Sequence, residues 1–301
     1  RQRRDGGDAV GERGVRPGQA GYLRLPAVTI VIRSRGFPPQ VAPMFLFRAD
    51  ASLKAHAAYK QAKAGDKNAA LELVLDLAVA WLYEHRERFA PGLVFVAPHA
   101  QEATGDNAIP QTLAAVCAEI SGGVVDTEIV QSDRVYHTGA DPMERMAMRA
   151  EFEGRVVAGA RYVLVDDVTN LGGTLAELCN FIAAHGGVIE DVLVLVNAGR
   201  NPALVPGKKF VRLIKERFDD EFTEVFGIEP EALTANEAEY LVGFRSIDAI
   251  RNRLAAAEQE IDRRLRSKGI VRAAEATPSG AHADQGLTPS KPESGADRSA
   301  P

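Results

Sequence analysis

The chain has 301 residues, of which 46% are hydrophobic and 26% charged, a balance typical of a globular protein with one large domain or two small ones. Its formal net charge of −5 and isoelectric point near 5.8 argue against a nucleic-acid-binding surface, and no apolar run approaches the ~20 residues of a membrane span. Its two cysteines, Cys117 and Cys179, form no CxxC pair, which argues against structural zinc and favours buried, reduced thiols in a cytoplasmic protein.

Residues 1–43 differ in composition from the rest of the chain. They are rich in Arg, Gly and Pro, they lack the apolar core of a signal peptide, and only residues 28–32 read as strand-like. The first methionine, Met44, precedes the first strong apolar pattern, so we expect the natural protein to begin near it. The alternative is a disordered arm, which the composition also permits. On both readings, residues 1–43 should add little stability because they offer little to bury.

Residues 44–92 are expected to form a helical N-terminal segment. One helix is predicted at 52–64, and Asp66 can cap a second helix that carries a broad apolar face. Pro91-Gly92 closes the segment.

Residues 93–213 alternate between strand and helix patterns, which predicts an α/β fold with a doubly wound, mostly parallel sheet. An apolar strand at 93–97 leads into the polar loop PHAQEATGDN and a helix at 108–120, and a second strand is predicted at 124–130. Ligands of open α/β sheets bind at the carboxyl ends of the strands. The polar loop is therefore a candidate for ligand contact.

The segment at 131–154 is too polar and too interrupted to belong to the core. Gly139 and Pro142 exclude one continuous helix. Its cations include Arg134, His137 and Arg145, and taken by themselves they fit a solvated loop with scattered charges.

The stretch RYVLVDDVTNLGGTLAEL, residues 161–178, is the most informative part of the sequence. Its apolar run at 162–165 predicts a strand buried on both faces, and Asp166 and Asp167 stand where this strand should end. A glycine turn at 170–174 follows, and a helix begins directly after it. Glycine amides, a hydroxyl and a helix N-terminus suit a phosphate, while two carboxylates can accept hydrogen bonds from vicinal hydroxyls. The order predicts a pocket for a phosphorylated sugar, and it matches neither the dinucleotide fingerprint nor a P-loop.

The chain after this stretch adds strands and then helices. A strand at 188–196 ends in Asn197-Ala198-Gly199-Arg200, and a last short strand is predicted at 210–213. Residues 269–301 hold almost no large apolar residue and are expected to form a disordered tail. The segment before this tail, 214–268, has helical patterns at 214–226, 234–241 and 246–266.

Residues 163–174, VLVDDVTNLGGT, resemble the signature of the type I phosphoribosyltransferases: an apolar strand, two acids, two mostly apolar residues, and a five-residue turn containing Gly and ending in Thr or Ser. The resemblance implies their doubly wound sheet, with a helical hood built from residues 44–92, the C-terminal helices, or both. It implies that Asp166 and Asp167 hold the ribose 2- and 3-hydroxyls of phosphoribosyl pyrophosphate (PRPP). The 5-phosphate would lie on Asn170, Leu171, Gly172, Gly173 and Thr174.

The same resemblance implies further contacts by position in the fold. The pyrophosphate would meet the loop of Pro98, His99, Ala100 and Gln101. The base would lie near Asn197 and Arg200. A mobile loop would close over the substrates and stabilise the leaving pyrophosphate, with Arg134, His137 and Arg145 as its catalytic residues. Mg²⁺ is expected as a cofactor that binds mainly through PRPP, with no ligand directly from the protein.

The implied function is transfer of the 5-phosphoribosyl group of PRPP to a nitrogen nucleophile such as a nucleobase, with release of pyrophosphate, by a cytoplasmic enzyme. Its partners would be PRPP and a nucleobase-like molecule, with no nucleic acid and no membrane, and a homodimer is left open. Asn170 and Leu171 depart from the residues common in the family, and Asn170 cannot take a proton. The alternative is therefore a non-catalytic module that senses PRPP or a nucleotide. A receiver-like fold would need a lysine at a later strand end, where Asn197 and Leu213 stand.

Overall fold

The structure, a computed structural model, describes residues 32–99, 101–102, 105–132 and 140–267. Its centre is a five-stranded sheet in the order β1-β9-β8-β2-β5, in which all paired strands are parallel. The prediction of an α/β fold with a doubly wound, mostly parallel sheet is thereby confirmed. The strands are β1 (Met44–Phe47), β2 (Val94–Val96), β5 (Val124–Val125), β8 (Arg161–Thr169) and β9 (Val188–Asn197).

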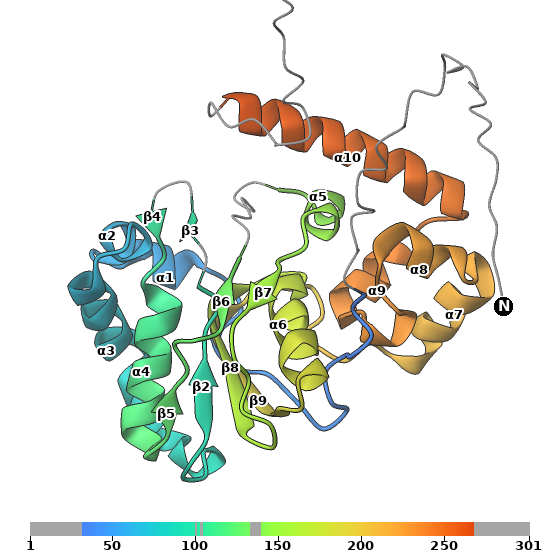
Figure 1. Ribbon diagram of the computed structural model, residues 1–301. Helices are drawn as coiled ribbons and strands as arrows, with labels where there is room; N and C mark the ends of the chain where they lie inside the picture. The colour runs from blue at the N-terminus through green and yellow to red at the C-terminus, as the bar shows by residue number, and fades with distance from the viewer. Residues whose placement is uncertain (1–31, 100, 103–104, 133–139, 268–301) are drawn as a thin grey trace, which may run out of the picture.

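The central strand β8 is buried on both faces because helices cover both sides of the sheet (Figure 1). One layer contains α1 (Ala51–Ala55), α2 (Tyr59–Lys63), α3 (Lys67–Glu84) and α4 (Ile109–Ser121). The opposite layer contains α6 (Gly173–Ala184) and the chain that precedes β1. Val163 and Val165 pack into the first layer and Tyr162 and Leu164 into the second, as the alternation of a strand requires.

The strand order places a crevice in a definite position. From β2 the chain moves outward to β5, and then crosses back to β8 and β9 on the other side of β2. The order therefore reverses between β2 and β8. In open α/β sheets such a switch point separates the loops at the carboxyl ends of the two strands and creates a ligand-binding crevice there.

The C-terminal helices form a second hydrophobic cluster beside the sheet. Phe218, Phe222 and Phe226 pack against one another along its centre. Met143 joins this cluster from outside the C-terminal region. The helices are α7 (Lys208–Phe218), α8 (Glu221–Phe226), α9 (Ala235–Leu241) and α10 (Ile247–Ser267), with α5 (Pro142–Ala147) packed under α10. The remaining short elements are β3 (Gln101–Glu102), β4 (Gly105–Asp106), β6 (Val130–Gln131), β7 (Phe152–Glu153), η1 (Arg86–Arg88) and η2 (Pro230–Ala232).

The expectation that residues 1–43 add little to the fold is wrong for their last third. Arg33 is completely buried, and Phe37 and Val41 are buried against the α6 face of the sheet. The segment 44–92 is not wholly helical either, because β1 pairs with β9 at the sheet edge. All of residues 1–31 and 268–301 lie outside the described residues, so the expected tail is not addressed, and neither is the strand expected at 28–32 except for residue 32.

Three predicted elements differ in the structure. The predicted strand at 210–213 is part of α7, because Phe210, Ile214 and Phe218 recur every four residues and face the helical cluster. The predicted strand at 124–130 is interrupted after β5, where the Asp126 carboxylate accepts hydrogen bonds from the amides of residues 128 and 129. The predicted helix at 52–64 is divided into α1 and α2 at His56, whose backbone is extended. Among the described residues, no helix is long and apolar enough to cross a membrane.

Candidate functional site

Strand β8 continues through the acidic pair, rather than ending before it. Asp166 pairs with Val194 of β9, and the pairing runs on to Thr169 and Asn197. The glycine turn follows immediately, and α6 begins at Gly173. Gly172 has φ +82°, a left-handed conformation that strains any residue with a Cβ atom, so the turn depends on glycine there.

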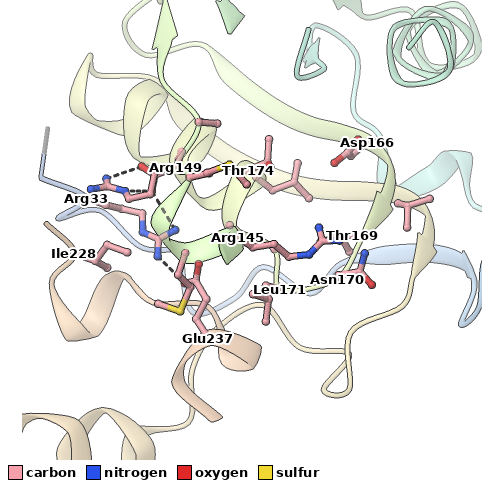
Figure 2. Close-up of a pocket in the computed structure, with 18 residues that line it drawn as sticks. Arg33, Arg145, Arg149, Asp166, Thr169, Asn170, Leu171, Thr174, Ile228 and Glu237 are labelled. Carbon is pink, nitrogen blue, oxygen red and sulfur yellow. Dashed lines mark hydrogen bonds and ion pairs between the residues drawn. The ribbon is translucent and has the colours of Figure 1, made fainter. Parts of the chain in front are cut away.

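The turn and the first residues of α6 line a small cavity of about 50 Å³, hereafter the first cavity (Figure 2). Gly172, Gly173, Thr174 and Leu175 all belong to its lining. The first amides of a helix have no intrahelical acceptor, and no side chain caps α6. These donors and the helix dipole make the first cavity suitable for an anion, as the sequence predicts.

A buried ion cluster lies beside the glycine turn and the start of α6, and the sequence did not indicate it. The guanidinium of Arg33 donates to Glu237 at 2.6 Å and lies 3.4 Å from Glu177. Arg149 forms a two-pronged pair with Glu177 at 2.6 and 2.9 Å, and also donates to the carbonyls of residues 226 and 227. Burial disfavours the charge on Arg33, but the carboxylates of Glu237 and Glu177 outweigh this effect and raise its pKa.

This cluster connects four segments that are distant in the sequence. Arg33 precedes β1, Arg149 follows α5, Glu177 lies on α6 and Glu237 on α9. All four side chains line the first cavity (Figure 2). The only sequence signal is an acid in the apolar face of α6, whose partner cannot be identified without the fold. The cluster therefore fixes the start of α6 relative to the C-terminal helices.

The two aspartates of the acidic pair have different surroundings. Asp166 lines the first cavity, and burial together with the Asp167 carboxylate raises its pKa well above the usual range. Asp167 is 4% exposed and accepts hydrogen bonds from Lys63 of α2 and Asn107 before α4, both at 3.1 Å. The structure thus gives the cavity-facing position to Asp166, and directs Asp167 toward α2 and α4.

A second cavity of about 360 Å³ adjoins the first, and the two share Arg145, Asn170 and Leu171. Its volume lies in the range of small-molecule sites. Asn236, Glu239 and Tyr240 of α9 form one wall, so the C-terminal helices contribute to the site. The opposite wall is the chain after β9, which includes Ala198, Gly199 and Arg200.

The two residues predicted on the base side have different positions. Arg200 lines the second cavity. Asn197 is buried at the end of β9, where its amide donates to the carbonyl of Pro202 and stabilises the following loop. Arg48, at the end of β1, donates to the Gly199 carbonyl at 2.7 Å and holds the same loop against the sheet edge.

The predicted loop cation Arg145 lies on α5 and borders both cavities. Its Nε donates to the carbonyl of Ala140, and burial together with the neighbouring Arg264 lowers its pKa. Helix α10 anchors α5 through the ion pairs of Arg253 with Asp141 and of Arg264 with Glu144. The other two candidates, Arg134 and His137, lie outside the described residues.

The predicted pyrophosphate loop is only partly described. Pro98 and His99 follow β2 after Ala97, on the β2 side of the switch point, and His99 is hydrogen-bonded to Gln111 of α4. Ala100 and the side chain of Gln101 lie outside the described residues, although the backbone of Gln101 begins β3. Because β2 runs parallel to β8, the described part of this loop lies at the carboxyl end of the sheet, as does the acidic pair.

Comparison with known proteins finds partial relatives. No protein-family model matches the chain. It is 37% identical over 219 residues to Protein TraN of Escherichia coli, an alignment that covers 69% of this chain and 48% of TraN. The chain therefore spans about half the length of this curated relative. A shorter alignment of 71 residues, 35% identical, covers 24% of this chain and 37% of an adenine phosphoribosyltransferase of Roseiflexus sp. (strain RS-1).

Solved structures similar to the chain include the adenine phosphoribosyltransferase of Leishmania donovani, which is 14% identical, with a TM-score of 0.32 over 67% of this chain and 89% of that one. The adenine phosphoribosyltransferase of Thermoanaerobacter pseudethanolicus is 17% identical, with a TM-score of 0.28 over 42% and 73% of the two chains. Both similarities are low, and the fold is established by the strand order of the sheet itself.

Proposed function

We propose that the protein is a phosphoribosyltransferase that transfers the 5-phosphoribosyl group of PRPP to a nitrogen atom of a nucleobase-like acceptor. The observation that carries this proposal is the meeting of three features beside the switch point. These are an uncapped helix N-terminus behind a glycine turn, the cavity-facing carboxylate of Asp166, and an adjoining cavity of about 360 Å³. The short sequence similarity to an adenine phosphoribosyltransferase agrees with it.

In this proposal the first cavity holds the ribose 5-phosphate end of PRPP. The amides that begin α6 and the hydroxyl of Thr174 donate to the phosphate. Asp166 accepts hydrogen bonds from the ribose hydroxyls, and binding them compensates the burial of its charge. Asp167 keeps its hydrogen bond from Asn107 and supports Asp166 from the neighbouring strand position.

The acceptor occupies the second cavity, beside the carbon that it attacks. Polar side chains on its walls, among them Asn170, Asn236 and Glu239, can orient a flat heterocycle by hydrogen bonds. The C1–oxygen bond breaks with its electron pair leaving on pyrophosphate, and an acceptor nitrogen forms the new bond to C1 and loses its proton. Such a reaction needs positioning and charge stabilisation more than a covalent intermediate.

Two side chains, Arg145 and Asn170, are placed to act on the groups whose charge changes during the reaction. Arg145 borders both cavities, so its guanidinium can approach negative charge that develops between the acceptor and the sugar. Asn170 also borders both, and its amide can orient the acceptor but cannot receive the proton. The proton therefore leaves through another group or through water.

The donor set at the site also fits Mg²⁺ carried by PRPP. Among the described residues, no group of three or more His, Cys, Asp or Glu side chains could hold a metal by itself. Asp166 offers carboxylate oxygen, the ligand type that Mg²⁺ prefers, and substrate oxygens and water would complete its shell. When bound, the ion would neutralise charge on the pyrophosphate.

The test is a screen of nucleobases with the purified protein, PRPP and Mg²⁺, in which pyrophosphate release is measured. We expect release with at least one base, and its loss in Asp166→Asn. Binding of PRPP by calorimetry without turnover on any base would instead support a non-catalytic sensor, which the Asn at position 170 already favours as the second candidate. Absence of PRPP binding would contradict both.

A further inference from the structure

We propose that Lys63 of α2 is a substrate-binding residue that holds the pyrophosphate end of PRPP, so that α2 completes the site from outside the motif-bearing core. This inference rests on the proposed function. It concerns a cation from a segment in which the sequence showed no chemistry. Lys63 is paired with Asp167, with Nζ 3.1 Å from Oδ2.

The position of Lys63 is fixed by the fold. The Ala62 carbonyl accepts a hydrogen bond from the Ala108 amide at 3.1 Å, and Ala62 is fully buried. This contact joins the end of α2 to the start of α4, beside the loop that leaves β2. In Figure 1, α2 lies close to the β3–β4 hairpin at the carboxyl end of the sheet. Lys63 therefore stands on the β2 side of the switch point, whereas the phosphate turn stands on the β8 side.

Asp167 does not depend on Lys63 alone for its hydrogen bonds. Its Oδ2 also accepts from Asn107 at 3.1 Å, and its Oδ1 accepts from the Val168 amide at 2.9 Å. These donors remain if the ammonium moves away. The side chain of Lys63 is 20% exposed while that of Asp167 is 6% exposed, so Lys63 is the more accessible partner of the pair. A lysine ammonium on its flexible stem can turn toward a neighbouring anion with little rearrangement.

The Lys63 ammonium would offset the repulsion between the two aspartates and a bound pyrophosphate. The acidic pair suits the ribose hydroxyls but repels a pyrophosphate bound nearby. Arg33 and Arg149 cannot offset this repulsion, because both are paired with buried carboxylates beneath the turn. Lys63 is close enough to the pair to favour the charged form of Asp166 as well as to contact Asp167. The same ammonium would shield a pyrophosphate from both carboxylates.

The experiment uses calorimetry in the presence of Mg²⁺ to measure separately how the protein binds the pyrophosphate end and the ribose 5-phosphate end of PRPP. The full chain is titrated with PRPP, with inorganic pyrophosphate and with ribose 5-phosphate. Lys63→Met removes the charge at similar length, Lys63→Arg keeps it, and Lys60→Met alters an exposed lysine on the same helix as the control. We expect Lys63→Met to weaken PRPP and pyrophosphate roughly 10- to 100-fold, as for one charged hydrogen bond, and ribose 5-phosphate less than about twofold. Lys63→Arg and Lys60→Met should remain near the parent.

Two outcomes would overturn the inference. Equal weakening of all three ligands would show that Lys63 acts only by supporting Asp167, and unchanged binding would show a structural ion pair. A parent protein that binds pyrophosphate in a Lys63-dependent way but does not bind PRPP would support the Lys63 site and contradict the proposed function.

If Lys63→Met does not fold, acetylation of Lys63 in the parent protein, measured by mass spectrometry, gives a second readout. Pyrophosphate should protect Lys63 and ribose 5-phosphate should not. Protection by neither ligand, or by both equally, would overturn the inference.

Discussion

The buried ion cluster of Arg33, Arg149, Glu177 and Glu237 leads to a stability prediction for Arg33→Met. Arg33 is fully buried and is the cation that Glu237 faces at 2.6 Å. In the variant, Glu177 keeps its two-pronged pair with Arg149, whereas Glu237 loses its cation and keeps the hydrogen bond from the Thr234 amide. The variant therefore leaves one carboxylate charged and buried.

Removing one partner of a buried ion pair typically costs about 3–5 kcal/mol, mainly because the other charge stays buried. We expect Arg33→Met to lower the free energy of unfolding by about that amount. Adding Glu237→Gln removes the stranded charge, and the glutamine oxygen can still accept from the Thr234 amide. The double variant should therefore be more stable than Arg33→Met alone, although both single changes destabilise the protein.

The assay is urea denaturation monitored by circular dichroism, and a double-mutant cycle gives the coupling free energy between Arg33 and Glu237. Arg35→Met, at an exposed arginine two residues away, is the matched control and should change stability by less than about 0.5 kcal/mol. A loss below about 1 kcal/mol in Arg33→Met, or a double variant that loses the full sum of the single losses, would refute the reasoning.

The remaining predictions concern the site and the N-terminal segment. Asp166→Asn should weaken ribose 5-phosphate roughly 10-fold or more in calorimetry, with a smaller effect for Asp167→Asn, whose carboxylate points away from the first cavity; the reverse ranking would contradict the site. Burial and the Asp167 carboxylate raise the pKa of Asp166 in the folded protein above its value of ~3.9 in the unfolded chain. At pH values between these two pKa values, Asp166 is protonated in the folded protein but ionised in the unfolded chain. Stability should therefore fall as pH rises through this window, and an unchanged slope in Asp166→Asn would show that another group is responsible. Arg145→Ala should reduce kcat on the order of 10²-fold with little change in PRPP affinity, whereas a near-parental kcat would exclude its role in the reaction. Deleting residues 1–43 should lower the melting temperature sharply because buried side chains are lost, and deletion of 1–31 is the control that retains them.

Local patterns in the sequence were sufficient for the central layer of the fold and for the glycine turn that precedes α6. The unbroken apolar run in β8 requires cover on both faces, and the structure supplies it with α4 on one side and α6 on the other. Two adjacent glycines before an apolar helix indicated a tight turn at a helix N-terminus, and Gly172 has the left-handed backbone that this turn needs. Both features arise from residues close together in the chain, where spacing alone carries the information.

The composition of the site beyond that turn was decided by tertiary structure. Arg33 and Glu237 are 204 positions apart, and Lys63 and Asp167 are 104 apart, so no periodicity in the sequence relates them. The sequence predicted a site role for Asp167, but for Arg33, Lys63 and Glu237 it showed only that a charged residue stands at each position. Whether a charge is buried depends on which partner the packed helices bring within hydrogen-bonding distance, because an unpaired charge cannot remain in the interior. The packing of α2, α6 and α9 near the carboxyl end of the sheet therefore determined which charged side chains meet at the candidate site.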